Sequence, residues 1–210
     1  MSLALGFLIY LVLLFSLSVH ECAHAWTAYR LGDPTARYLG RVTLNPIPHI
    51  DVVGTVIFPL FMIFGGVPLF GWAKPVPVNP YNLHNPRRDH MWVAAAGPLS
   101  NFALCLVGIL LYRIFFVETS LGGGSRLLHD FLLYGAILNA VLGTFNLIPI
   151  PPLDGGGVIE RFLSPAMAQK FEMIKPFGML ILFAFLLLGL LHLIIMPIQA
   201  LVLFLMTVPL

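Results

Sequence analysis

Residues 20–24 read His-Glu-Cys-Ala-His, an HExxH pattern within a long apolar stretch. At about 3.6 residues per turn, His20 and His24 project from one helix face about 40° apart, so both imidazoles can bind one metal ion. Glu21 lies about 100° round the helix, where its carboxylate can hold a metal-bound water. Two nitrogen ligands, an open coordination position and a carboxylate are what a zinc hydrolase needs. The pattern therefore indicates His20 and His24 as ligands and Glu21 as the general base.

The alternative is that these are two hydrogen-bonded helix histidines beside an unrelated glutamate. A charged side chain at the centre of a membrane helix costs at least about 2.5–3.5 kcal/mol on insertion scales and usually has a function. The metal-binding interpretation is therefore the better one.

A third protein ligand is expected, and Asp154 is the candidate with the most unusual context. The other four aspartates lie beside loops or helix starts, where helix capping explains them. Asp154 follows three prolines that end a predicted helix and precedes Gly155, Gly156 and Gly157. Irregular backbone at membrane depth is tolerated where it lines a cavity. From the residues alone, this segment is either a ligand-bearing cavity wall or a polar turn between helices.

The composition predicts a membrane protein. Hydrophobic residues make up 59% of the 210-residue chain and charged residues 10%, whereas soluble domains are about 45–50% apolar and about 25% charged. No basic run is long enough to indicate nucleic-acid binding. We expect a single transmembrane domain over residues 1–210.

Spanning a bilayer takes about 20 apolar residues. Three core helices are predicted over residues 3–29, 91–117 and 127–147, and residues 178–206 form either one long helix or a hairpin. Residues 52–70 are apolar but are interrupted by glycine and proline, and residues 71–80 carry Pro75, Pro77 and Pro80. The expected fold is therefore all-α and polytopic, with a re-entrant segment at 52–70 and short extended strands near the cytoplasmic face.

The positive charges favour a re-entrant segment over a fifth crossing. If residues 52–70 do not cross, nine of the eleven basic residues share the side on which the first helix ends, and the positive-inside tendency makes that side cytoplasmic. These are Arg30, Arg37, Arg41, Lys74, Arg87, Arg88, Arg161, Lys170 and Lys175. His20, Asn101, Asn146 and Asp154 then also fall at one depth near that side. Charge bias and metal geometry therefore agree.

Several elements together resemble the site-2 protease family of intramembrane zinc metalloproteases. They are HExxH in an early transmembrane helix, Gly97-Pro98-Leu99-Ser100-Asn101, and Asn-x-x-Pro-x-x-x-Leu-Asp-Gly ending at Gly155. Residues 71–80 resemble the loop of the compact prokaryotic members, which lack PDZ and CBS domains. The motifs run in order from residue 20 to 155.

The resemblance implies a three-helix catalytic core around one Zn²⁺ per chain, held by His20, His24 and Asp154. It further implies a multi-pass protein of a prokaryotic cell membrane, with its active site inside the bilayer nearer the cytosol. The expected partners are a transmembrane protein substrate and the lipid bilayer. Asn101 and Asn146 are expected to face the metal cavity and to donate hydrogen bonds to substrate or to an oxyanion, unless they only join helices.

Two other functions fit the same residues. Intramembrane His and Asp occur in ion pathways, so a metal-binding transporter is one alternative, although the chain lacks the paired repeats typical of transporters. A proteolytically inactive, helix-binding relative is the other. Glu21 argues against the inactive relative, because a protein without hydrolytic activity has no need of that carboxylate.

Overall fold

A computed structural model describes residues 2–67, 71–118 and 125–208, and these residues form helices and connecting segments. Four helices are long and apolar enough to cross a membrane, which confirms the predicted all-α polytopic fold. They are α1 (Leu3–Arg30), α4 (Pro86–Arg113) with its π-helical extension η4 (Ile114–Glu118), α5 (Arg126–Asn146) and α9 (Leu190–Thr207).

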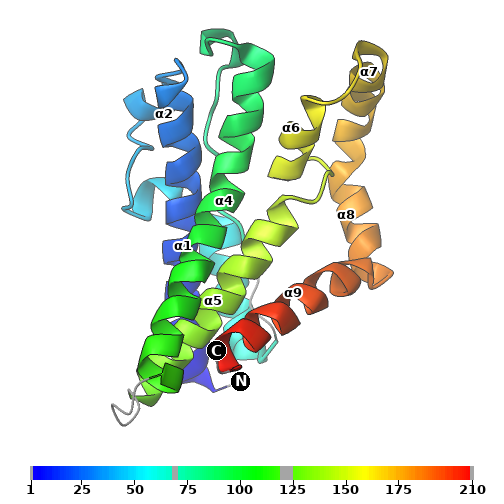
Figure 1. Cartoon of the computed structure of the whole chain (residues 1–210). Helices are drawn as coiled ribbons and strands as arrows, with labels where there is room; N and C mark the ends of the chain where they lie inside the picture. Colours follow the sequence, from blue (N-terminus) through cyan, green and yellow to red (C-terminus); the bar gives the residue numbers. More distant parts are fainter. Residues whose placement is uncertain (1, 68–70, 119–124, 209–210) are drawn as a thin grey trace.

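Shorter helices connect these spans. They are α2 (Thr35–Tyr38), η1 (Ile47–His49), η2 (Val52–Ile57), α3 (Phe58–Gly65), η3 (Pro80–Asn82), α6 (Asp154–Glu160), α7 (Pro165–Ile174), η5 (Lys175–Phe177) and α8 (Gly178–Leu187). α4 and α5 run side by side, and α6 and α7 lie at the end of the molecule where α1 ends and α4 begins (Figure 1).

Small residues allow α4 and α5 to pack closely. A Cβ atom added at Gly108 would lie 3.2 Å from the Ala136 Cβ, and one added at Gly143 would lie 2.9 Å from the Phe102 ring. Small residues at helix contacts let backbones approach within the membrane, where no hydrophobic force drives helices together. A cluster of buried residues lies along the contact between α4 and α5 and includes two residues of α9. Its members are Cys105, Ile109, Tyr112, Leu132, Ala136, Ala140, Val202 and Met206.

The predicted re-entrant segment begins with η2 and α3, and its last three residues, 68–70, lie outside the described residues. The chain that follows the segment is hydrogen-bonded both to the start of the segment and to the chain before it. The Trp72 amide donates to the Gly54 carbonyl at 3.1 Å, and the Lys74 amide donates to the His49 carbonyl at 2.9 Å. The two ends of the segment therefore lie together, which is the geometry that a re-entrant segment requires.

The prediction of short strands is wrong for the part of the chain that the structure describes, where no β-strand occurs. Residues 71–79 are extended but form no ladder with another strand. Pro75 and Pro77 have no amide hydrogen to donate. The amides of Val76 and Asn79 donate instead to the carboxylates of Glu21 and Asp33.

Asp33 anchors the end of this extended segment. Burial opposes its ionisation, but hydrogen bonds from the Thr35 hydroxyl, the Asn82 amide group and the Asn79 backbone amide hold the pKa of Asp33 below its ordinary value. The ionised carboxylate thus joins the loop after α1 to the chain that leads into α4.

The last apolar stretch forms two helices. α8 ends at Leu187, and Gly189 adopts φ +71, a left-handed conformation that favours glycine, before α9 begins. α9 then runs obliquely back towards α1, α4 and α5 (Figure 1). Arg113, at the end of α4, donates to the carbonyls of Leu205 and Val208 at 2.8 Å and so fastens the end of α9.

We expect Gly54→Ala to destabilise the contact between η2 and the extended segment. The added Cβ would lie 2.3 Å from the Trp72 indole, so the ring or the backbone must move, which typically costs about 1–3 kcal/mol. Gly65→Ala is the matched control, because no atom lies within 4 Å of the added Cβ. Thermal unfolding in detergent should show a lower transition for Gly54→Ala only; equal transitions in both variants would contradict this packing.

Candidate metal centre

The two histidines of HExxH lie one turn apart on α1, and both are buried. Their Nε2 atoms are 3.0 Å apart, and the ring centroids are 4.6 Å apart with the planes nearly perpendicular. The 3.6-residue helical period thus brings the two Nε2 atoms of His20 and His24 to one point.

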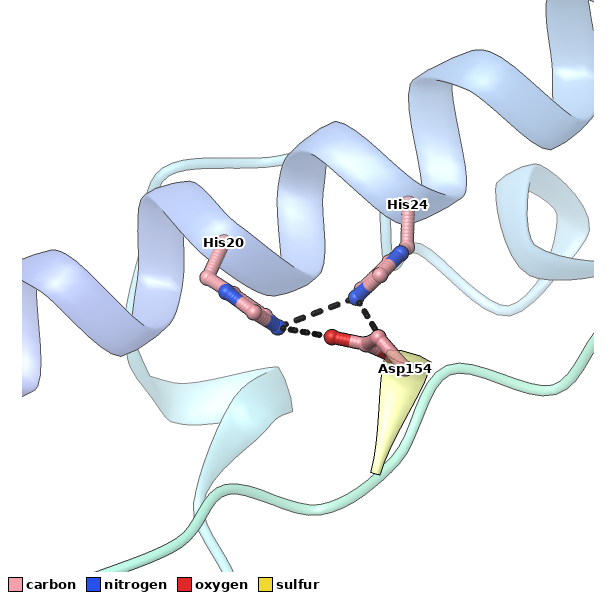
Figure 2. Close-up of side chains that lie close together, drawn as sticks. All are labelled: His20, His24 and Asp154. Atoms are coloured by element: carbon pink, nitrogen blue, oxygen red, sulfur yellow. Dashed lines mark hydrogen bonds and ion pairs between the residues drawn. The ribbon is translucent and has the colours of Figure 1, made fainter. Parts of the chain in front are cut away.

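Asp154 reaches the same point from a different helix, α6, which lies at the same end of the core (Figure 1). It is the first residue of α6, whose start follows the proline-interrupted segment after α5. Its Oδ2 lies 3.1 Å from His20 Nε2, and its Oδ1 lies 3.3 Å from His24 Nε2 (Figure 2). One ligand atom from each of His20, His24 and Asp154 lies within 4.8 Å of the others.

Gly155 allows this approach. A Cβ atom at this position would lie 2.3 Å from the Leu147 carbonyl oxygen and 2.4 Å from that of Ile148. α6 can therefore begin directly against the end of α5 only because residue 155 has no side chain. The Asp-Gly pair is thus explained by packing as well as by chemistry.

The far nitrogen of each imidazole has an acceptor. His24 Nδ1 is 2.7 Å from the Val93 carbonyl oxygen, and His20 Nδ1 is 2.6 Å from Asn101 Oδ1. A carbonyl oxygen can only accept, so each Nδ1 carries the hydrogen and each neutral ring presents its Nε2 lone pair. Two lone pairs 3.0 Å apart beside a carboxylate form a donor set suited to zinc.

Gly97 on α4 keeps the space beside these lone pairs open. An added Cβ would lie 2.3 Å from His24 Nε2 and 2.5 Å from His20 Nε2. α4 therefore forms one wall of the site, and the absence of a side chain at residue 97 leaves room next to both nitrogen ligands. This space and the donor set together fit a zinc ion.

Asn101 is held by the protein on both sides of its amide. Its Oδ1 accepts from His20, and its Nδ2 donates to Asn139 Oδ1 at 2.8 Å. Asn139 Nδ2 donates in turn to Ser16 Oγ at 2.9 Å. All four residues are at most 5% exposed, so a chain of hydrogen-bonded polar side chains runs through the core to His20 Nδ1.

Asn101 and Asn146 were both expected to donate to a substrate or an oxyanion, and their contacts support this role less for Asn101 than for Asn146. Both amide atoms of Asn101 are engaged within the protein, which suits orientation of His20 better than donation to a substrate. Asn146 donates to the Leu142 carbonyl of its own helix. Sequence reasoning missed Asn139, although a lone carboxamide in an apolar helix was a usable signal.

Glu21 is also buried, and its contacts come from the connection between α2 and η1 and from the extended segment. Its Oε2 accepts a hydrogen bond from the Val76 amide at 3.1 Å, and Arg41 Nη2 lies 3.9 Å from the same oxygen. Sequence reasoning did not single out Arg41 or Val76 as neighbours of this carboxylate, because both are distant from it along the chain.

Comparisons with known proteins agree with this chemistry. The model of peptidase family M50 matches residues 8–124 and 124–189. A Bacillus subtilis protein named "Putative zinc metalloprotease YwhC" is 39% identical over 173 residues, which cover 81% of this chain and 76% of the relative. A Mycobacterium tuberculosis protein named "Putative zinc metalloprotease Rip2" is 33% identical over 172 residues, covering 80% of this chain and 62% of the relative. No solved structure gives a significant match.

We expect Gly97→Ala to weaken metal binding without unfolding the chain. The added methyl would occupy the space next to both Nε2 atoms, so zinc affinity should fall at least about tenfold, which corresponds to about 1.4 kcal/mol. Gly135→Ala is the control, because its added Cβ would meet its nearest neighbour at an ordinary 4.0 Å. Zinc titration of the purified proteins, with helix content followed by circular dichroism, measures the difference; wild-type affinity in Gly97→Ala would refute the site.

Proposed function

Because this chain belongs to peptidase family M50, the site-2 proteases, we propose that it hydrolyses a peptide bond within or near the transmembrane helix of a membrane-protein substrate. The family and its relatives make the chain a multi-pass membrane zinc metalloprotease. The observation that carries the finer proposal is the convergence of His20, His24 and Asp154 on one buried point among apolar spanning helices. Residues 1–210 act in this proposal as one transmembrane domain.

In this proposal His20 Nε2, His24 Nε2 and one Asp154 oxygen hold a single zinc ion. When bound, zinc supplies Lewis acidity and lowers the pKa of a coordinated water towards about 7. Asn101 and the Val93 carbonyl keep both imidazoles in the tautomer that presents Nε2. The partly buried carboxylate of Asp154 would complete the protein ligands from the start of α6.

Glu21 acts as the general base. It is not a ligand in this scheme, and its buried carboxylate takes the proton of the water that attacks the scissile carbonyl carbon. The C–N bond then breaks as Glu21 returns this proton to the leaving amine. Asn146 is a second polar group at the same end of the core and remains a candidate oxyanion donor, for which removal typically costs about 10²–10³ in rate.

A transmembrane helix does not offer its amides for hydrolysis, because each backbone carbonyl is already hydrogen-bonded within the helix. The substrate must therefore unwind locally before attack. Glycine or proline near the cleaved bond lowers the cost of unwinding, so substrates with such residues should be favoured.

The proposed active site lies nearer the cytoplasmic side. Two sets of hydrogen bonds join segments that carry basic residues at the end of the molecule that holds the site. Arg41 donates to the Lys74 carbonyl, and Arg87 donates to the carbonyls of Glu160 and Leu163. Arg113 and Arg126 lie at the other end, where α4 ends and α5 begins. The positive-inside tendency makes the end with the greater number of basic residues cytoplasmic.

We expect a cysteine introduced at Lys74 to react only with reagents that reach the cytoplasm. The reason is that residues 52–70 enter and leave on the same side, so Lys74 remains on the side of Arg41. A cysteine at Arg126 serves as the opposite control and should be labelled from outside. Labelling of residue 74 by an impermeant reagent in intact cells would refute the re-entrant segment and the cytoplasmic site together.

We expect Glu21→Gln to keep its zinc and lose nearly all proteolysis, because only the proton acceptor is removed. His24→Ala should lose both, because it removes a ligand. Co-expression with a library of single-pass membrane proteins, comparing wild type with Glu21→Gln, identifies substrates by the cleavage products that disappear. Metal content is then measured beside cleavage in detergent. Full activity in Glu21→Gln would exclude this mechanism whatever the metal content.

A further inference from the structure

Arg41 is a buried arginine on the connection between α2 and η1, with 5% of its surface exposed. Burying a guanidinium is costly unless its donors find acceptors and its charge finds an opposite charge. Its donors point in three directions. Nε donates to His49 Nδ1 at 3.3 Å, Nη1 donates to the Pro75 carbonyl at 3.4 Å, and Nη2 donates to the Lys74 carbonyl.

His49 holds Arg41 from behind. Its Nε2 lies 2.9 Å from the Thr43 carbonyl, which can only accept, so Nε2 carries the hydrogen and Nδ1 is free to accept from Arg41. The His49 backbone carbonyl also accepts from the Lys74 amide at 2.9 Å. Arg41 and His49 together therefore fix the backbone of residues 74 and 75.

This fixed backbone leads directly to Glu21. The next residue, Val76, donates its amide to Glu21 Oε2 at 3.1 Å, and the charge of Arg41 lies 3.9 Å from that oxygen. Glu21 is the carboxylate that forms an ion pair with Arg41 among the described residues. The amide thus holds one carboxylate oxygen, and Oε1 is the oxygen that would take the proton in the proposed mechanism.

We infer that Arg41 is a positioning residue for the general base: it holds residues 74–76 so that the Val76 amide orients Glu21. This inference rests on the proposed function, because it assigns Arg41 to the step that Glu21 performs. Arg41 touches neither the ligands nor the substrate in this account, and it acts through the extended segment and its charge.

The geometry explains why the residue is arginine. A planar guanidinium can donate to His49, Pro75 and Lys74 from three fixed nitrogens and still face Glu21 with its charge. A lysine would keep the positive charge but would lose the planar set of three donor nitrogens. Arg41→Lys therefore separates positioning from charge alone, and Val76→Pro removes the one amide hydrogen while keeping the extended backbone that Pro75 and Pro77 already favour.

The test uses zinc-loaded full-length protein and a single-pass substrate identified by the Glu21→Gln comparison. Arg41→Lys, Val76→Pro and the double variant are compared with Arg37→Lys, which alters an exposed arginine that stacks over the Tyr29 ring at 4.3 Å. Zinc per chain, kcat, KM and hydrogen exchange of residues 71–79 are measured for each protein.

We expect Arg41→Lys and Val76→Pro to keep wild-type zinc and a KM within about twofold. Each should lose about 10- to 100-fold in kcat, which is part of the roughly 10²–10⁴-fold that general acid–base catalysis contributes. The double variant should lose little more than the worse single variant, because both changes act on one oxygen. Exchange over residues 71–79 should quicken in Arg41→Lys, while Arg37→Lys should match wild type.

A wild-type kcat in both Arg41→Lys and Val76→Pro would overturn the inference while leaving the proposed function intact. Additive losses in the double variant would overturn it also, because two independent structural defects add. If Arg41→Lys lost zinc or failed to fold, Val76→Pro would decide the outcome, since it leaves Arg41 in place. A zinc-loaded wild-type protein that cleaved no membrane protein would instead end the proposed function, and this inference with it.

Discussion

The structure depends on bringing two imidazole lone pairs and a carboxylate to one point inside a bundle of apolar helices. Lone pairs at His20 and His24 that face each other at 3.0 Å repel without a cation, so the rest of the core must hold them there. Acceptors behind each ring set the tautomers, and Gly97 and Gly155 remove side chains that would prevent the approach. These features concern four separate segments, α1, α4, α5 and α6, that meet at one end of the core.

Backbone hydrogen bonding is the second constraint on this fold. Backbone amides that are removed from water need acceptors, and the extended segment at residues 71–79 has no partner strand among the described residues. Pro75 and Pro77 have no amide hydrogen and so need no acceptor. The carboxylates of Glu21 and Asp33 accept hydrogen bonds from two of the remaining amides. One of these carboxylates is Glu21, so the bond that satisfies the Val76 amide also orients the proposed base. This one hydrogen bond therefore serves both the extended segment, by giving an amide its acceptor, and the proposed catalysis, by orienting the base.

Helical periodicity and composition predicted the fold class and the shared face of His20 and His24, while the resemblance to the site-2 proteases was needed to add Asp154. The all-α polytopic fold is confirmed, and the expected grouping of His20, His24 and Asp154 is the geometry found, while their role as zinc ligands remains a proposal. The short strands near residues 71–80 were predicted wrongly. Alternating valine and proline indicates extended backbone, but a strand also needs a partner, and no local pattern specifies whether one is present.

The sequence by itself determined the contacts that lie within one helical turn, because spacing along an α-helix fixes which side chains share a face. His20, Glu21 and His24 belong to this class. Only the tertiary structure decided the contacts that complete the site: Asn101 with His20, Asn139 with Asn101, and Val76 with Glu21, which are separated by 81, 38 and 55 residues. These pairings depend on how the helices pack and where the extended segment returns. Neither is encoded in the spacing of residues along the chain.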